Sequence, residues 1–326
     1  MMDNLIAGFT KQMAEAIEIG RKIELTPRHK DIRNIVIAGL GGSGIGGNLV
    51  AGLIAGKMKL PLVVCKDYFL PEFANEHTLL IASSYSGNTE ETLHALEEGI
   101  NRGCKIVCIS SGGSLISIAK KAGLDYVIIP GGKPPRACLT YSFIQQLFIF
   151  YYYGLIDDGF VVGIQEAIIH LDKEEKHIQK LAKQIAKKLN KKIPIIYSAA
   201  NMEAVAMRWR QQLNENSKVL CWHHVIPEMN HNELVGWRTP GKFAVLLLRN
   251  DIDYTRTQHR MNIVKNIISQ YTRHIIEIYS KGDSFIEKSL YLIHLGDWVS
   301  WYLSSLRKVD ASEVNVIDYL KMELAN

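Results

Sequence analysis

Short runs of β-branched and other apolar residues alternate with helical patterns through the first half of the chain. The runs are apolar at nearly every position, which is typical of strands buried on both faces. Strands are expected over residues 34–40, 60–65, 78–84, 104–110 and 125–130, and helices over 3–20, 43–56, 89–102, 114–122 and 137–154. Apolar strands separated by helices predict a mostly parallel sheet covered on both faces.

The second half of the chain repeats this pattern. Helices are expected over 163–190, 200–213, 252–270, 283–306 and 313–325, and strands over 192–198, 218–223, 242–248 and 274–280. The segment GLIDDGF at 154–160 interrupts the pattern, so we expect one domain over 1–154 and another over 155–326. The predicted fold class is α/β, with two doubly wound domains that are copies of one unit. Repeated doubly wound units often place an active site between them, at the carboxyl ends of the strands.

Composition and charge exclude several classes of protein. The chain has 326 residues, 47% of them hydrophobic and 22% charged, which is typical of globular proteins and sufficient for two domains. Its 38 basic and 33 acidic residues give a net charge of +5, spread along the chain. Nucleic-acid binders usually concentrate basic charge in a stripe or tail, so nucleic acid is not favoured as a partner.

The sequence also predicts a cytoplasmic location. The longest apolar stretch, 147–156, is far shorter than the roughly 20 residues of a membrane helix, so no membrane association is expected. The N-terminus lacks the basic region of a secretory signal. Five cysteines, an odd number lying mostly inside apolar runs, favour reduced thiols over a disulfide framework.

A glycine-rich turn, Gly39-Leu40-Gly41-Gly42-Ser43-Gly44, follows the first expected strand and opens a helix. Backbone N–H groups at such a position suit an anion. A P-loop needs Lys followed by Ser or Thr after the last glycine, and Asn48-Leu49 does not supply them. A dinucleotide fingerprint, with Asp67 beyond the second strand as the ribose ligand, stays open. So do a phosphate ester held by Ser43, and glycines that serve only close packing.

A second turn, from Ser83 to Thr92, follows the third expected strand and is rich in hydroxyls. Ser84, Ser86 and Thr89 are close enough in sequence to converge on one ligand, and hydroxyls with free amides at a helix start suit a phosphate dianion. A helix N-cap would use one hydroxyl and leave the others unexplained. We therefore expect this turn to bind phosphate.

Both turns, with three later segments, resemble one protein family. GLGGSGIGGN and SSYSGNTEETL are similar to the sugar isomerase (SIS) domain, a phosphosugar-binding α/β fold often duplicated within a chain. PPRACL (134–139), QLNENSKV (212–219) and PEMNHNELVGW (227–237) resemble the bifunctional phosphoglucose/phosphomannose isomerase family. The resemblance runs from about residue 35 to the C-terminus. It implies an N-terminal SIS domain with the phosphate-binding turns and a C-terminal one with catalytic residues.

The resemblance implies interconversion of glucose 6-phosphate, and mannose 6-phosphate, with fructose 6-phosphate through a cis-enediol. This reaction needs a carboxylate base, a group that opens the sugar ring and a partner for the enediolate oxygens. By resemblance, Glu215 is the base, His231 assists ring opening from the neighbouring subunit of a homodimer, and Lys321 contacts the sugar. Arg136 would face the enediolate oxygens. The phosphate would be held by Gly42, Ser43, Ser84, Ser86 and Thr89.

Three further expectations concern the chemistry. Asn230, Asn232 and Glu233 share the motif of His231 and could orient it, and Glu233 could equally well be a surface residue. A metal-assisted hydride shift would need clustered carboxylates and histidines, and the adjacent His223-His224 diverge on a strand, so neither a metal nor another cofactor is expected. The alternatives are a non-catalytic phosphosugar-binding regulator and an NAD-dependent dehydrogenase.

One segment departs from the family pattern. The family commonly carries a DPTP-like sequence before the terminal helix, where this chain has Asp310-Ala311-Ser312-Glu313. Ser312 keeps a hydroxyl at the threonine position, but the prolines are lost. If that hydroxyl makes room for the C2 epimer, the change bears on mannose 6-phosphate and leaves glucose 6-phosphate unaffected.

Overall fold

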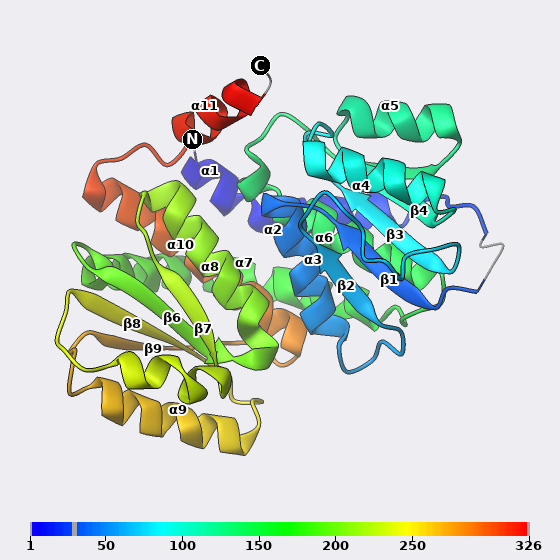
Figure 1. The fold of residues 1–326 in the computed structure, drawn as a ribbon. Coiled ribbons are helices and arrows are strands. Elements are labelled where there is room, and N and C mark those ends of the chain that lie inside the picture. The colour runs from blue at the N-terminus through cyan, green and yellow to red at the C-terminus, as the bar shows by residue number, and fades with distance from the viewer. Residues whose placement is uncertain (1, 28–30, 325–326) are drawn as a thin grey trace. The chain divides into compact units, whose positions relative to one another are not determined.

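The computed structural model describes residues 2–27 and 31–324, which form two compact units. The first unit is Gly8–Ile168, and the second comprises residues 2–7 together with 169–324. Each is an α/β structure in which helices pack on a parallel sheet, as Figure 1 shows.

The first unit is built on a five-stranded parallel sheet in the order β2-β1-β3-β4-β5. Its strands are β1 (Asn34–Ala38), β2 (Leu62–Cys65), β3 (Thr78–Ser83), β4 (Lys105–Ser110) and β5 (Asp125–Ile128). Its helices are α2 (Phe9–Gly20), α3 (Gly41–Ile54), α4 (Glu90–Asn101), α5 (Gly113–Ala122), the short 3₁₀ helix η1 (Pro135–Ala137) and α6 (Leu139–Tyr152). This strand order creates a switch point between β1 and β3, where successive connections leave on opposite faces of the sheet.

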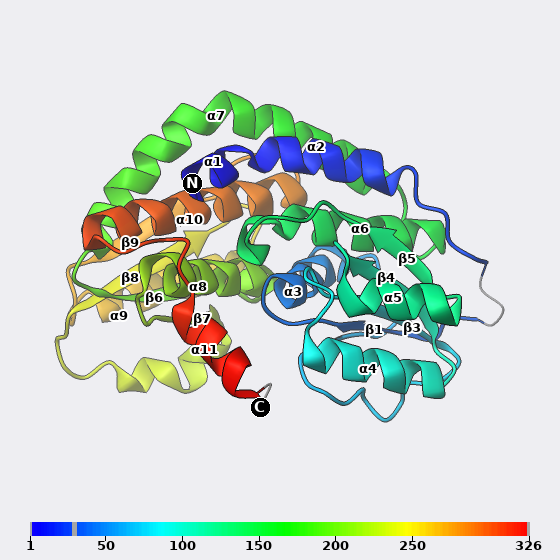
Figure 2. The same ribbon diagram turned by 90° about the horizontal axis from the view of Figure 1, so that it is seen from above.

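Alternate strand residues of the first unit pack into different layers. Val36, Leu80 and Ile106 join residues of α4 and α5 in one buried cluster. Ile37 points to the other face, where Gly47 of α3 fits closely against it. Figure 2 shows α3 and α4 on opposite sides of β1 and β3. All six residues of β3 are buried, because both faces of the sheet are covered.

The second unit has a four-stranded parallel sheet in the order β7-β6-β8-β9. Its strands are β6 (Ile193–Ala199), β7 (Trp222–Ile226), β8 (Phe243–Arg249) and β9 (Ile275–Tyr279). Its helices are α1 (Met2–Ala7), most of α7 (Gly159–Leu189), η2 (Ala200–Met202), α8 (Glu203–Ser217), η3 (Glu228–His231), η4 (Glu233–Gly236), α9 (Thr255–Ile268), α10 (Phe285–Arg307) and α11 (Asn315–Leu324).

Helices α8 and α10 of the second unit pack together through buried polar groups as well as apolar ones. The Arg208 guanidinium lies 3.0 Å from an Asp297 carboxylate oxygen, and both side chains are almost fully buried. Trp209 Nε1 donates a 2.8 Å hydrogen bond to the carbonyl of Leu292. On the other face of the sheet, Met261 and other residues of α9 bury against β6 and β8.

The expected α/β class is confirmed, and most expected elements lie within a few residues of the observed ones. The strand expected over 218–223 is wrong in position, since β7 begins only at Trp222. Helix α8 runs to Ser217 and ends on Lys218 in the left-handed conformation, so the apolar residues that follow belong to the turn that ends the helix.

The units also divide the chain differently from the expected boundary after residue 154. The expected leading helix breaks at Gly8 into α1 and α2, and α1 packs against α10 through Met2 and Ile6. The segment 154–160 is a short turn that continues into the first residues of α7, and the division between the units falls inside α7 after Ile168.

Two further observations concern the cysteine side chains and the apolar character of the helices. All five cysteines are free thiols. Among the helices of the described residues, none is both long enough and apolar enough to cross a bilayer.

Candidate functional site

The glycine-rich turn lies where three segments of the first unit meet. An added Cβ on Gly39 would lie 2.7 Å from the carbonyl oxygen of Ser83, and one on Gly42 would lie 2.9 Å from that of Pro135. Side chains do not tolerate such distances, so both positions need glycine. The close packing expected as one role of this turn is therefore present. It also brings the turn against the segment that carries Arg136.

The hydroxyl-rich turn between β3 and α4 is braced by its own side chains. Ser84 Oγ accepts a 3.1 Å hydrogen bond from Gly87 N and lies 2.8 Å from Thr89 Oγ1. Ser86 Oγ accepts from Asn88 N at 3.2 Å. Thr89 is the N-cap residue of α4, but its side chain makes no capping bond. The hydroxyls thus shape the turn, and the first-turn N–H groups of α4 have no partner within the helix.

A direct hydrogen bond joins the two turns at the β1–β3 switch point. Ser43 Oγ accepts from Tyr85 N at 3.2 Å, and Ser43 is itself buried. Arg136, on η1 beside Gly42, is only 4% exposed and adds a positive charge to this end of the sheet. The structure therefore places the predicted substrate-binding residues on three adjoining segments: Gly42 and Ser43; Ser84, Ser86 and Thr89; and Arg136.

A small polar network beside Tyr85 was not anticipated from the sequence. The Tyr85 hydroxyl accepts from Lys133 N at 3.2 Å, and burial together with the neighbouring Cys138 raises the pKa of Tyr85 above its ordinary value. Lys133 Nζ donates to the Tyr141 hydroxyl at 3.3 Å, which donates to Glu15 at 2.6 Å. The only sequence signal for Lys133 is its position directly before the Pro-Pro-Arg segment.

Glu215 lies in the last turn of α8, in the second unit, and its neighbours hold that turn in place. Asn216 is fully buried and donates to Ser300 Oγ of α10 at 2.9 Å. Lys218 Nζ donates to the backbone carbonyl of Glu215 at 2.5 Å. Glu215 itself is half-buried. The helix end is therefore anchored next to a carboxylate that keeps access to solvent.

His231 is the last residue of η3, in the segment that follows β7. The peptide bond between Ile226 and Pro227 at the start of this segment is cis. His231 is exposed on its own chain, whereas Met229 and Trp237 on either side of it are buried.

Lys321 lies on α11, a helix with no buried residue. No hydrogen bond or ion pair joins Lys321 to His231 within the part of the chain that the structure describes. Ser312 precedes this helix in a turn where its N–H donates to Asp310 Oδ1 at 2.8 Å, so this aspartate helps to organise the turn. Glu215, His231 and Lys321 thus lie on three separate elements of the second unit.

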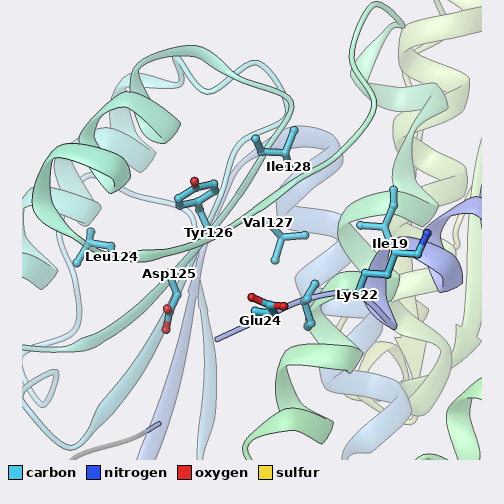
Figure 3. A pocket seen from close by; sticks show the side chains of 9 residues that line it. Ile19, Lys22, Glu24, Leu124, Asp125, Tyr126, Val127 and Ile128 are labelled. Carbon is cyan, nitrogen blue, oxygen red and sulfur yellow. The ribbon is translucent and has the colours of Figure 1, made fainter. Parts of the chain in front are cut away.

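The remaining features of the described chain do not coincide with these residues. A cavity of about 490 Å³ lies beside the edge strand β5 of the first unit, with side chains from the end of α2 and from β5 on its opposite sides (Figure 3). At its rim Asp125 accepts a 2.7 Å bond from Lys105 Nζ. None of the predicted site residues lines it. Among residues 2–27 and 31–324, no three His, Cys, Asp or Glu side chains gather as metal ligands would.

Known proteins resemble the chain over nearly its whole length. Residues 178–324 match the family model of the bacterial phospho-glucose isomerase C-terminal SIS domain. The chain is 41% identical over 326 residues to the bifunctional phosphoglucose/phosphomannose isomerase of Caldicellulosiruptor bescii, covering 97% of this chain and 96% of that one. It is 36% identical over 305 residues to the protein of the same description from Aquifex aeolicus, covering 92% of each chain.

Among solved structures, the fold is similar to the C-terminal domain of glucosamine-fructose-6-phosphate aminotransferase from Francisella tularensis. The TM-score is 0.80 over 96% of this chain and 98% of that one, at 13% sequence identity. At this identity the similarity concerns the fold alone.

Proposed function

Because the chain belongs to the bifunctional phosphoglucose/phosphomannose isomerase family, we propose that it interconverts glucose 6-phosphate and mannose 6-phosphate with fructose 6-phosphate. The observation that carries this proposal is the 41% identity to such an enzyme across nearly all of both chains. The two joined turns of the first unit, with buried Arg136 against them, support a phosphorylated sugar as the ligand.

In this proposal the first unit holds the phosphate. Ser43, Ser84, Ser86 and Thr89 supply hydroxyls, and the starts of α3 and α4 supply backbone N–H groups. A hydrogen bond to a charged group contributes roughly 1.5–3 kcal/mol, so several of them can hold a dianion without a lysine. Arg136 is left to face the sugar oxygens on which negative charge develops.

Ring opening comes first, since the sugar phosphate enters as a hemiacetal. The anomeric hydroxyl loses its proton and the ring oxygen gains one as the bond between C1 and that oxygen breaks. We assign proton delivery to His231, and a contact with the sugar that aids this step to Lys321.

Proton transfer between C1 and C2 follows on the open chain. Glu215 removes the proton from C2 of the aldose, the electron pair forms the C1–C2 double bond of a cis-enediolate, and Arg136 stabilises the negative oxygen. A proton moves from the oxygen on C2 to the oxygen on C1, and Glu215 then returns its own proton to C1, which leaves the ketone at C2. In the reverse direction C2 is planar and can be protonated on either face, which gives glucose 6-phosphate or mannose 6-phosphate.

The proposed enzyme is a cytoplasmic homodimer in which His231 acts in the neighbouring subunit's site. Exposure of His231 on its own chain supports this arrangement, and five free thiols support a reducing compartment. No cofactor is invoked, because the proton leaves one carbon and returns to the next without net oxidation.

A coupled assay of the purified protein tests the proposal. Turnover of glucose 6-phosphate to fructose 6-phosphate is expected, and mannose 6-phosphate is measured separately because Ser312 replaces the family's threonine. Binding of sugar phosphates without turnover would overturn the proposal in favour of a regulatory protein. Full activity of a monomer on a sizing column would contradict a histidine supplied by the neighbouring subunit.

A further inference from the structure

Residues 227–237 of the second unit form the segment that carries His231. The segment contains two 3₁₀ helices, η3 and η4, of four residues each, which provide few backbone hydrogen bonds. Met229 and Trp237 bury their side chains and hold the two ends. His231 is exposed between them, so its position depends on whatever restrains the middle of the segment.

One carboxylate in that middle is held by two strands of the sheet. Glu233 Oε1 accepts a 2.5 Å hydrogen bond from the Tyr197 hydroxyl and a 2.9 Å bond from Trp222 Nε1. Tyr197 is fully buried in β6, and Trp222 is the first residue of β7, the neighbouring strand. Trp237 Nε1 donates to the same Tyr197 hydroxyl at 3.2 Å. We call Glu233, Tyr197 and Trp222 the carboxylate clamp.

The Tyr197 hydroxyl carries the proton that its hydrogen bond to Glu233 needs. Burial and the adjacent Glu233 carboxylate raise the pKa of Tyr197 above its ordinary value, so the phenol keeps its proton and donates it. Hydrogen bonds to an ionised acceptor are roughly twice as strong as neutral ones. A solvated surface glutamate would not collect two side-chain donors from the sheet.

The clamp connects to His231 through a single residue. Asn232 Oδ1 accepts from Glu233 N at 2.5 Å, and Asn232 Nδ2 donates to Glu228 Oε1 at 2.8 Å. Asn232 therefore ties the start of η4 to the start of η3. Because His231 is the last residue of η3, a shift of Glu233 would be passed directly to the histidine.

We propose that Glu233 is a positioning residue, which fixes against Tyr197 and Trp222 the segment from which His231 reaches the sugar ring. This inference rests on the proposed function, since it assigns Glu233 a role through His231. Glu233 does not itself touch the reacting atoms. Its effect on the reaction is therefore expected to disappear when His231 is absent.

A double-mutant cycle tests that expectation. His231→Ala is expected to lower kcat/KM about 100-fold, within the range of general acid catalysis. Glu233→Ala alone is expected to lower kcat/KM about 30-fold, because a displacement of about 1 Å can cost up to about 100-fold. In the His231→Ala background the same change is expected to cost less than about 2-fold. Equal losses in both backgrounds would show a general structural role and overturn the proposal.

Conservative variants separate the clamp from a loss of folding. Glu233→Gln keeps an oxygen acceptor and is expected to recover activity to within about 3-fold of the natural chain. Tyr197→Phe keeps the buried volume but removes one donor, and is expected to lose about 5-fold only when His231 is present. The matched control is Val235→Ala, which truncates an exposed side chain of the same segment that takes no part in the clamp or in its connection to η3. A loss in the control as large as in Glu233→Ala would overturn the proposal.

Amide hydrogen exchange tests the clamp without relying on activity. Glu233→Ala is expected to speed exchange over residues 227–237 at least about 10-fold while β6 and β8 stay protected. Unchanged exchange in the segment would overturn the clamp even if the enzyme is active. If the natural chain shows no isomerase activity, the proposed function fails, and the exchange result still decides whether Glu233 restrains the segment.

Discussion

Both units have a switch point between two central strands, β1 and β3 in the first and β6 and β8 in the second. In each, one hydrogen bond links the turns that follow these strands. In the first unit Ser43 Oγ accepts from the backbone of Tyr85 at 3.2 Å. In the second, Asn201 Nδ2 donates to Asp253 Oδ1 at 3.2 Å. The strand topology is the same at both switch points, but the groups differ. The first unit places a hydroxyl there, and the second unit places a carboxylate.

Asp253 is 5% exposed, and its burial raises its pKa above the ordinary value. A carboxylate at this place disfavours a phosphate dianion, which the hydroxyls and amides of the first unit suit. A duplicated fold therefore does not imply a duplicated site, because function depends on the side chains placed on the fold. In the second unit the candidate catalytic residues lie elsewhere, at the end of α8, after β7 and on α11.

Removing the proposed base should separate the roles of the two units most strongly. Glu215→Gln is expected to lower kcat by about 1,000-fold or more, within the upper range of general acid–base catalysis. Fructose 6-phosphate binding, measured by calorimetry, should change less than about 3-fold, because the phosphate is held in the first unit. Near-normal kcat would refute Glu215 as the base.

Adding a side chain to the glycine-rich turn should disrupt the packing of this turn against the segment that carries Arg136. In Gly42→Ala the new Cβ would lie 2.9 Å from the Pro135 carbonyl, which forces η1 and Arg136 away from the turn. A displacement of about 1 Å can cost up to about 100-fold, so we expect kcat/KM to fall about 30-fold. Gly56→Ala is the control, since a Cβ there meets no atom within 4 Å. Equal activities of the two variants would contradict the prediction.

Removing one hydroxyl from each unit compares how much the turns at the carboxyl ends of the two sheets contribute to substrate binding. Ser84→Ala loses the bonds to Gly87 N and Thr89 Oγ1 in the first unit, and we expect KM to rise about 10-fold. Ser280→Ala removes a 3.2 Å bond to Asn250 at the end of β9 in the second unit. We expect KM in that variant to stay within about 2-fold of the natural value. A larger effect at Ser280 than at Ser84 would reverse the assignment of the phosphate.

Replacing Asp253 by a neutral residue should give the smallest effect. Unlike the losses of activity predicted above, this change should stabilise the folded protein. The raised pKa of Asp253 means that the ionised carboxylate destabilises the folded state at neutral pH. Asp253→Asn is therefore expected to unfold at a higher temperature than the natural chain at pH 7. The advantage should shrink as the pH falls through this raised pKa, and it should vanish well below about 3.9, the ordinary aspartate value, where the natural side chain is protonated in both states. A lower midpoint at pH 7 would count against this account.

Much of the fold follows from local patterns in the sequence. The apolar runs that became β1, β3 and β4 are buried on both faces, and such runs are visible without knowledge of tertiary contacts. The misplaced strand at 218–223 shows where local reasoning fails. Its first residues are apolar enough for a strand, but the left-handed Lys218 ends α8 there and makes them part of a turn.

The candidate site was predictable where its residues are close in sequence. Ser84, Ser86 and Thr89 share one turn, so their hydroxyls could be grouped from spacing alone. The carboxylate clamp could not be derived in this way, because Tyr197 and Glu233 are 36 residues apart and meet only once the second sheet has formed.

The pairing of α1 with α10 has a consequence for the order of events during synthesis. Met2 and Ile6 leave the ribosome before the residues of the first unit, whereas α10 spans Phe285–Arg307 and leaves after them. The nascent chain must therefore carry an apolar N-terminal helix without its partner while Gly8–Ile168 emerges and can fold. Cleavage of the chain after residue 168 would leave α1 on the fragment that lacks α10. The part of the α10 surface that α1 covers would then be exposed to water.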